Sequence, residues 1–276
     1  MILRWRNKTT LPVESESLRP EEFLGLAAAG AAQLPAHIGN QVGELGDIFE
    51  CNDDGSIVLT LEGDLRRVRG IGRGMAAGRL VVRGTAGPEL GHNMAGGEIE
   101  VFGDAGDRAG GSMRGGVLRV RGNAGRSVGG ADPGGRPGMK DGVILVDGSA
   151  GPEAGALMRR GLIAVGGPVG EGFGRGMIAG SLFAFGPVGR HPGTGMKRGT
   201  IALFGVEAPE LLPSFEAAGS YRFPFLSVYL KRLSAWGFEV PEEWRSAALS
   251  RYNGDRADGG IGEILVARGG SKVMSA

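Results

Sequence analysis

The sequence predicts an all-β fold: a right-handed, single-stranded parallel β-helix of about seven to eight coils of 19 residues, with partly helical caps at both ends. A methionine recurs every 19 residues, with one interval of 26. Glycines stand three and nine residues after each methionine, and apolar residues alternate with others between these glycines. The methionines are Met75, Met94, Met113, Met139, Met158, Met177 and Met196. This period excludes collagen, in which glycine recurs every third residue.

Each repeat contains the pattern Gly-x-Ile-x-Val-x-Gly, whose period of two is typical of a strand with one buried face. We expect the alternate apolar residues, such as Leu80 and Val82, to point inward. Nineteen residues suit one coil of short strands and tight corners. Glycine is needed at those corners for positive φ, or because a Cβ would collide with the next coil. The methionines are expected to fill the core rather than bind a metal or ligand.

Residues 1–54 do not repeat and are expected to form an N-terminal cap, followed by the β-helix over residues 55–205. A helix is expected to begin at residues 19–24, where a proline and two carboxylates stand in the first turn, and to end near Gly30. Residues 42–51 alternate loosely and predict a strand. Residues 56–61 predict another strand, in a degenerate first coil that lacks its methionine.

Residues 206–276 predict a C-terminal helical cap that also serves as a docking extension for another subunit. A helix over residues 224–236 would place five large side chains on one face: Leu226, Tyr229, Leu230, Leu233 and Trp236. A second helix is expected from Pro241 to a point before Gly254, and a last strand over residues 262–267. Tyr229, Leu233 and Trp236 are the expected partner contacts in this extension.

Composition narrows the class of protein. The 31 Lys and Arg residues nearly balance the 30 Asp and Glu residues, which argues against a general attraction to nucleic acid or membranes. Cys51 is the single cysteine, so the sequence offers no disulfide framework and no thiolate metal cluster. No run of signal-peptide type and no stretch of membrane-spanning length is found, so a cytoplasmic protein is expected.

The sequence predicts neither catalytic residues nor metal ligands. His37, His92 and His191 are isolated, without the spacing of a metal site. Polysaccharide-active β-helices need carboxylates aligned on adjacent coils, and the outward columns here mix charge types instead. Glu100 beside Arg119 is expected as an exposed pair of little energetic weight. A stand-alone enzyme acting on polysaccharide is therefore the least favoured function.

Two departures from the repeat remain as candidate contact sites. Residues 65–73 carry four arginines, Arg66, Arg67, Arg69 and Arg73, which form either a solvated face or a patch for an acidic ligand. The insertion at residues 130–138, which contains Arg136, breaks the 19-residue period once. An irregular loop on a regular rod is a natural partner contact, although a plain tolerated insertion fits equally well.

Residues 63–78, followed by coils of the form GxxMxGGxIxVxGxAG, resemble the C subunit of formylmethanofuran dehydrogenase. They are similar, more distantly, to the C-terminal β-helix domain of glutamate synthase. Residues 46–49 (GDIF) also match the dehydrogenase protein, so the resemblance covers roughly residues 42–205. The tail after residue 205 resembles the bacterial relative, the C subunit of the formyltransferase/hydrolase complex of methylotrophs.

The resemblance implies a non-catalytic scaffold in a hetero-oligomer that moves a formyl group from tetrahydromethanopterin to a methanofuran-type carrier and releases formate. The implied partners are a formyltransferase subunit and an amidohydrolase-like subunit, with no cofactor on this chain. The four arginines of residues 65–73 would then bind or guide a polyglutamate tail of the carrier. The alternative is the same scaffold in a molybdenum- or tungsten-dependent formylmethanofuran dehydrogenase, a redox enzyme.

Overall fold

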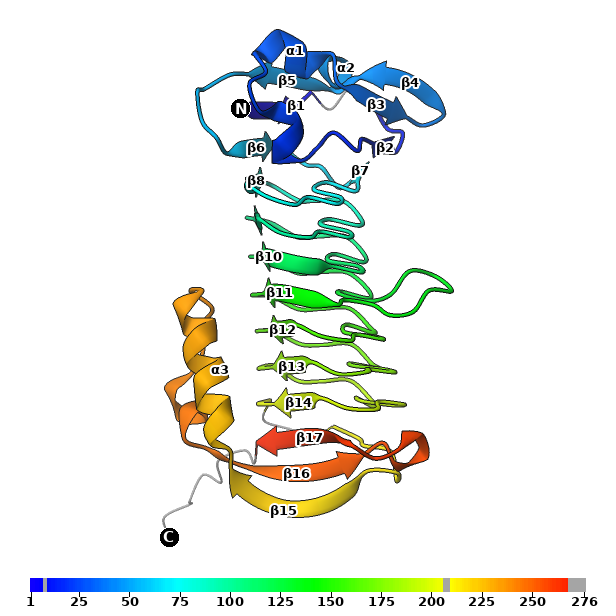
Figure 1. Cartoon of the computed structure of the whole chain (residues 1–276), viewed down its shortest axis with the longest axis vertical. Coiled ribbons are helices and arrows are strands. Elements are labelled where there is room, and N and C mark those ends of the chain that lie inside the picture. Colours follow the sequence, from blue (N-terminus) through cyan, green and yellow to red (C-terminus); the bar gives the residue numbers. More distant parts are fainter. Residues whose placement is uncertain (7–8, 206–208, 268–276) are drawn as a thin grey trace.

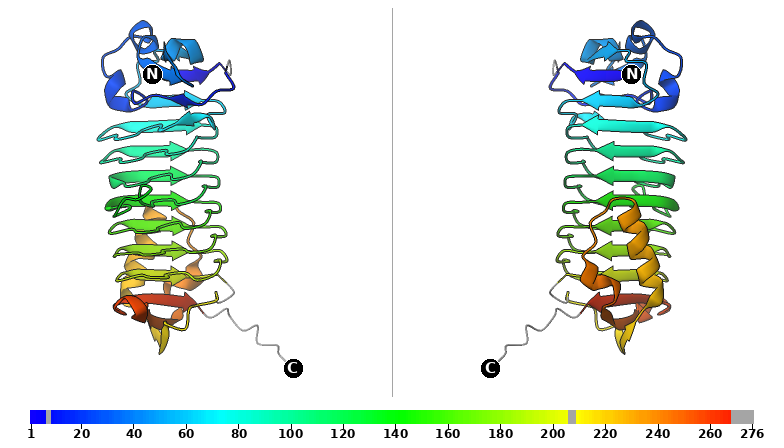
Figure 2. Two further views of the ribbon diagram at one scale, coloured as in Figure 1. Left: turned by 90° about the vertical axis from the view of Figure 1, so that its right-hand side faces the viewer. Right: turned by 90° about the vertical axis from the view of Figure 1, so that its left-hand side faces the viewer.

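The protein is an elongated stack of coils with a distinct group of elements at each end (Figure 1). The computed structural model describes residues 1–6, 9–205 and 209–267. One sheet of 13 strands runs along the molecule in the order β15-β16-β17-β14-β13-β12-β11-β10-β9-β8-β6-β1-β5. The N-terminal elements lie at one end of the coils, and the last three strands lie at the other (Figures 1 and 2).

The middle strands of this sheet are parallel, and each belongs to one coil. They are β6 (Leu59–Glu62), β8 (Arg79–Arg83), β9 (Glu98–Val101), β10 (Arg114–Val120), β11 (Asp141–Val146), β12 (Leu162–Val165), β13 (Ser181–Ala184) and β14 (Thr200–Leu203). Equivalent repeat positions pair in register, so Leu80 lies beside Ile99 and Ile99 beside Leu118. The predicted inward columns are buried, with Leu80 and Val82 both 0% exposed. The chain is therefore mostly β, with a large and mainly parallel sheet.

A second ladder joins the same coils after each strand. Isolated parallel bridges connect Leu65, Ala86, Ala105, Ala124, Ala150, Val169 and Val188 in that order. The seven methionines of the repeat are all 0% exposed and pack within one apolar cluster with these coils. The prediction that the methionines fill the core is confirmed.

The N-terminal region departs from two sequence predictions. The helix expected from residue 19 to Gly30 is two short pieces, a 3₁₀ turn η1 (Pro20–Phe23) and α1 (Ala28–Ala32), because Gly25 adopts a left-handed φ of 75° between them. The strand expected over residues 42–51 is broken into β4 (Gln41–Glu44) and β5 (Phe49–Asn52) by the helical turn α2 (Leu45–Ile48). The Asp47 carboxylate begins this turn by accepting from the amide of Glu44 at 2.9 Å.

The other N-terminal strands complete two sheets. β1 (Ile2–Trp5) lies between β5 and β6 in the long sheet, antiparallel to the first and parallel to the second. A sheet of four strands has the order β4-β3-β2-β7 and is completed by β3 (Pro35–Ile38), β2 (Val13–Glu14) and β7 (Val68–Arg69). Strand β6 begins at Leu59 rather than at residue 56, since the Ser56 hydroxyl accepts from the amide of Val58 at 3.0 Å and forms a turn there.

The C-terminal region confirms the first expected helix and the last strand, and corrects the second helix. α3 (Pro224–Ala235) and β17 (Gly262–Ala267) match the prediction, and β17 pairs in parallel with β14. The expected second helix is only a 3₁₀ turn, η2 (Glu242–Arg245), followed by strand β16 (Ala248–Gly254). β16 pairs with β17 and with β15 (Glu216–Arg222), so tertiary pairing overrides the local helical pattern. A short turn η3 (Arg256–Asp258) precedes β17.

Helix α3 covers the outer face of strands β11–β14, as the right-hand view of Figure 2 shows. Its Leu226, Leu230 and Leu233 are at most 3% exposed. They pack in one apolar cluster with outward side chains of the coils, namely Leu145, Ala164, Phe183 and Ala202. None of the helices in the described ranges is long and apolar enough to cross a membrane.

Candidate partner interface

The four arginines of residues 66–73 are engaged within the chain. Arg66 lies 2.8 Å from Asp64, and Arg67 donates to the carbonyl of Thr10. Arg69 and Arg73 both donate to the carboxylate of Glu89, the first at 2.7 Å. The structure therefore brings Arg69 and Arg73 together around a buried acid, while Arg66 and Arg67 lie along the same edge with partners of their own.

Glu89 and His92 belong to a buried polar network that also holds the insertion in place. Glu89 is 6% exposed and His92 is 5% exposed. Asp132, in the insertion, accepts from Arg108 at 2.5 Å and from the Ser112 hydroxyl at 3.2 Å, and lies 3.4 Å from Nε2 of His92. Charge-assisted hydrogen bonds of this kind fix the base of the projecting loop seen in Figure 1. The insertion is therefore anchored at Asp132.

We expect the His92 side chain to make the free energy of unfolding decrease when the pH is lowered below 6.5. Burial lowers the pKa of His92 below its usual 6.5, against the opposing charges of Asp132 and Glu89 and with help from Arg73 and Arg108. Protonation would also place a proton on Nδ1, which is buried and lacks a partner among the described residues. The unfolded chain binds this proton more readily than the folded chain. The stability that neutral His92 contributes is therefore fully present above pH 6.5 and is lost as the pH falls below that value.

Urea unfolding of the wild type and of His92→Gln between about pH 7.5 and about pH 5.5 measures this effect, because few other side chains titrate in that range. The wild type is expected to lose more stability over this interval than the variant. An equal loss in both proteins would contradict a role for His92.

The insertion borders a cavity of about 710 Å³ on the side of the coils. Asp132 and Arg136 face it from the insertion, and Glu153, Arg175 and Lys197 face it from neighbouring coils. Arg136 is exposed, and its contact with a partner stays a prediction. Asp258 also lines this cavity, so its lining carries both signs of charge in equal number.

A second cavity, of about 620 Å³, lies between α3 and the starts of the coil strands. Tyr229, Arg232 and Trp236 line it from α3, and Asp141 and Arg160 line it from the coils. The guanidinium of Arg232 lies over the Trp236 ring at 4.9 Å from the ring centroid, which is a cation–π arrangement. This groove, called the α3 groove below, presents aromatic rings and arginines together.

The expected partner contacts on α3 thus separate into two kinds. Tyr229 and Trp236 are partly exposed and line the α3 groove. Leu233 is 0% exposed and packs against the coils beneath the helix, so its side chain has no surface left for a partner. Helical spacing identified the face correctly but did not distinguish its buried centre from its exposed edge.

Arg119 and Glu100 lie side by side in register, as predicted, but they are not an exposed pair. Both are 7% exposed. The carboxylate of Glu100 accepts from Arg79 at 3.0 Å and from Arg121 at 2.6 Å. Burial opposes ionisation, but the hydrogen bonds and positive charges of Arg121 and Arg79 together outweigh it and lower the pKa of Glu100. Arg119 instead donates to Asp147 at 3.0 Å and to the carbonyls of Trp236 and Gly237 at the end of α3. Sequence reasoning missed this role of Arg119.

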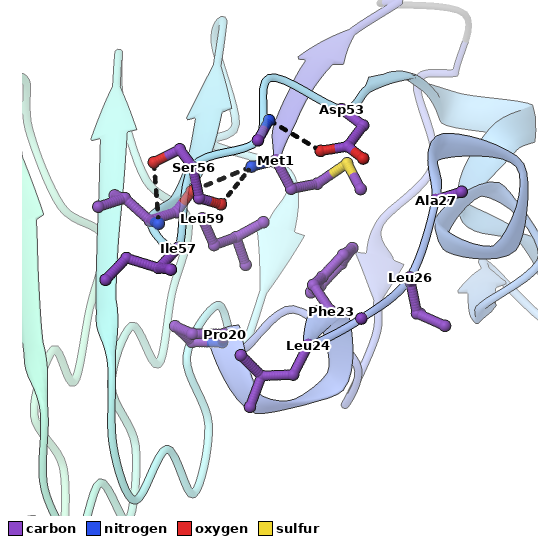
Figure 3. A pocket seen from close by; sticks show the side chains of 13 residues that line it. Met1, Pro20, Phe23, Leu24, Leu26, Ala27, Asp53, Ser56, Ile57 and Leu59 are labelled. Atoms are coloured by element: carbon purple, nitrogen blue, oxygen red, sulfur yellow. Dashed lines mark hydrogen bonds between the residues drawn. The ribbon is translucent and has the colours of Figure 1, made fainter.

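A third cavity, of about 420 Å³, lies between the N-terminal elements and the first coil (Figure 3). Leu24 and Ile57 border it and are 69% and 86% exposed. Of its lining residues, Asp53 is the only one with an ionisable side chain. Figure 3 shows that the polar contacts here are turn hydrogen bonds, such as that from Gly55 to Asp53 at 3.0 Å, and hydrogen bonds from the Met1 amino group to the carbonyls of Ser56 and Val58 at 3.2 Å. The lining provides apolar contact rather than acid–base chemistry.

The described residues contain no group of three or more His, Cys, Asp or Glu side chains that could hold a metal ion. Burial raises the pKa of the Cys51 thiol, with the Arg6 charge opposing, which disfavours the reactive thiolate form. The features that stand out from the regular coils are the projecting insertion with its cavity and the α3 groove.

Comparisons with known proteins agree with this geometry. No family model matches the sequence. Over 83 residues the chain is 36% identical to the C subunit of molybdenum-containing formylmethanofuran dehydrogenase 1 of Methanothermobacter thermautotrophicus, covering 29% of this chain and 21% of that protein. Over 96 residues it is 34% identical to the C subunit of tungsten-containing formylmethanofuran dehydrogenase 2 of Methanothermobacter wolfeii, covering 33% and 36%. The match thus spans between 21% and 36% of these curated relatives.

A solved structure matches over nearly the whole chain. It is a chain of the formyltransferase/hydrolase complex (FhcABCD) of Methylorubrum extorquens, crystallised in complex with methylofuran. The TM-score is 0.88 and the identity 32%, covering 97% of this chain and 99% of that one. The fold and these matches thus define a coil-stack subunit of a one-carbon enzyme complex. The chain belongs to the family of formylmethanofuran dehydrogenase C subunits, in its formyltransferase/hydrolase complex branch.

Proposed function

We propose that this chain is a non-catalytic scaffold subunit of a formyltransferase/hydrolase complex. That complex transfers a formyl group from tetrahydromethanopterin to a methanofuran-type carrier and releases formate. The observation that carries the proposal is the match along 97% of the chain to a member of such a complex. It includes the C-terminal elements after the last coil, whereas the matches to the dehydrogenase subunits cover 29–33% of this chain.

The architecture that suits this role is a right-handed parallel β-helix over residues 55–205, with an N-terminal cap over residues 1–54 and a docking extension over residues 206–276. Two parallel ladders support the helix: one joins strands β6 to β14, and the other joins the corners that follow strands β6 to β13. A rod of stacked coils has a fixed length and presents its side chains in a fixed arrangement, because each coil pairs with its neighbours by backbone hydrogen bonds. Such a rod holds partner subunits at a set separation in a cytoplasmic hetero-oligomer.

The partners proposed are a formyltransferase subunit and an amidohydrolase-like subunit, which would carry the chemistry and the carrier. The carrier-binding role expected for Arg66, Arg67, Arg69 and Arg73 stays a prediction. An acidic tail at this place would have to compete with Glu89, which holds Arg69 at 2.7 Å and also pairs with Arg73.

A second candidate is the same scaffold in a molybdenum- or tungsten-dependent dehydrogenase. The identity of 34–36% to such subunits over part of the chain favours it. A neighbouring gene for a subunit with pterin-ligand and iron–sulfur cysteines would support it over the first candidate.

Affinity purification of the tagged full-length chain from its native host tests the proposal. We expect a formyltransferase and an amidohydrolase-like subunit to co-purify, and the eluate to convert formyl-tetrahydromethanopterin to formate. Recovery as a free monomer would refute the scaffold role. Recovery with a molybdenum or tungsten subunit would transfer the role to the dehydrogenase.

A further inference from the structure

Six cations stand at the corner where strands β10, β11, β12 and β14 begin, and are called the basic corner. They follow the methionines of the repeat by one or two positions: Arg114, Lys140, Arg159, Arg160, Lys197 and Arg198. The first of these positions forms a column, because the amides of Arg114, Lys140 and Arg159 each donate to a methionine carbonyl of the preceding coil. Neighbouring coils are about 4.8 Å apart, so like charges are stacked here.

Elsewhere on the coils, acids and bases alternate from one coil to the next. Glu100 lies between Arg79 and Arg121, at 3.0 and 2.6 Å. Glu153 lies between Arg126 and Arg175, at 3.1 and 2.9 Å. Opposite charges on adjacent strands stabilise a sheet, and like charges directly opposite each other destabilise it. The coils therefore have a regular means of compensating charge.

The basic corner lacks this compensation. All six side chains are exposed, and none makes an ion pair with a carboxylate in the part of the chain that the structure describes. One acid stands among them: Asp141 pairs in register with Arg114, and its carboxylate accepts from the amide of Gly142 at 2.8 Å. Six cations beside one acid leave an excess of positive charge that does not help the chain to fold, so the charge pattern is better explained by a surface that meets a partner.

The α3 groove and the cavity beside the insertion both adjoin this corner. Arg160 lines the α3 groove together with Tyr229 and Trp236. Lys197 lines the cavity of the insertion together with Arg136. Arginine, tyrosine and tryptophan are the side chains that most often dominate protein–protein binding energy. The corner is thus flanked by apolar and aromatic anchor points on one side and a projecting loop on the other.

We propose that the basic corner is the docking surface for an acidic face of a partner subunit, with the α3 groove as its aromatic anchor. This inference rests on the proposed function, since it needs a partner subunit. A protein fits better than a nucleic acid, because the 31 basic and 30 acidic residues of the chain nearly balance, which argues against a general attraction to a polyanion. Cations in such a position steer association and fix the register of the partner.

The test compares two variants of the full-length chain with the same change in charge. Lys140→Glu combined with Arg159→Glu reverses the basic corner. Arg6→Glu combined with Arg83→Glu reverses two exposed arginines that lie outside the corner, outside both cavities and outside the docking extension, and that have no ion-pair partner among the described residues. Each protein is titrated with the remaining purified subunits of its complex, after nuclease treatment, over a salt series from about 50 to about 500 mM.

We expect the corner variant to bind at least about tenfold more weakly than the wild type at low salt, and the control variant to stay within about twofold. Affinity of the wild type should fall with salt, while the corner variant should show a smaller slope. Equal affinity of the two variants would overturn the docking inference and leave the scaffold role intact. If the wild type binds these subunits at no salt concentration, the proposed function itself fails. Partner binding that nuclease treatment abolishes would assign the corner to nucleic acid and also overturn the inference.

Discussion

Replacement of Arg119 by alanine is expected to lower the free energy of unfolding by about 2–3 kcal/mol, because it removes hydrogen bonds to a charged group, which contribute about 1.5–3 kcal/mol, and leaves two backbone carbonyls without this donor. Arg119 is 7% exposed and donates to both carboxylate oxygens of Asp147 at 3.0 Å. It also donates to the carbonyls of Trp236 and Gly237. These carbonyls follow the last turn of α3, where the helix cannot satisfy them itself. One side chain therefore joins α3 to the coils.

The loss should be centred on α3. Urea unfolding gives the total effect, and hydrogen exchange over residues 224–235 shows whether the helix opens before the coils do. Arg83→Ala is the matched control, because Arg83 is an exposed arginine on an outward position of β8 and should change stability by no more than about 0.5 kcal/mol. If Arg119→Ala unfolds at the same urea concentration as Arg83→Ala, Arg119 does not stabilise the packing of α3 on the coils.

The coil stack is predictable from sequence because one physical requirement recurs in every coil. Each coil must bury an apolar pair such as Leu80 and Val82 and must let its neighbour approach closely, so the same residues return at the same interval. The ends of the stack have no such repetition. There, single residues decide the structure: Gly25 interrupts a helix by its positive φ, and Asp47 starts a helical turn inside an apparent strand.

The position of α3 on the coils is indicated in the sequence by one column of outward-facing residues. One outward column changes from Glu100 and Arg119 in the earlier coils to apolar residues in the later ones, namely Leu145, Ala164, Phe183 and Ala202. Apolar side chains on an outward column indicate that something covers them, and α3 does. The buried centre of the helix, including Leu233, follows from this column.

The ion pairs around Glu89 could not be predicted from the sequence without the register of the coils. Arg69, Glu89 and Arg108 stand about one coil apart in sequence, yet only the register shows that the two arginines meet one carboxylate. The hydrogen bond from Arg69 lowers the pKa of Glu89 against the effect of burial, which keeps the acid ionised between them. Counting arginines in residues 65–73 therefore overstated the free positive charge at that edge.

The second large effect concerns close approach between coils. Gly87→Ala is expected to cost more than about 4 kcal/mol, a size of effect that single substitutions seldom reach. A Cβ at Gly87 would lie 2.2 Å from the carbonyl oxygen of Val68 and 3.0 Å from that of Arg66, both backbone atoms of the preceding coil. The φ of Gly87 is not in the left-handed region, so alanine suits its backbone conformation and the cost is steric. The coils can accept the methyl group only by moving apart, which breaks the hydrogen bonds between them.

Gly172→Ala separates this steric effect from the conformational cost of replacing a glycine. Gly172 has a left-handed φ of 70°, and the nearest atom to its added Cβ would be 3.6 Å away, on the side chain of Glu153. Alanine there should cost only about 1–2 kcal/mol, the usual price of a left-handed conformation. Urea unfolding of both variants, with hydrogen exchange to locate the opening between the coils of Val68 and Gly87, measures the difference. If Gly87→Ala is no less stable than Gly172→Ala, backbone contact between coils does not explain the glycine columns, and their role would be confined to turns.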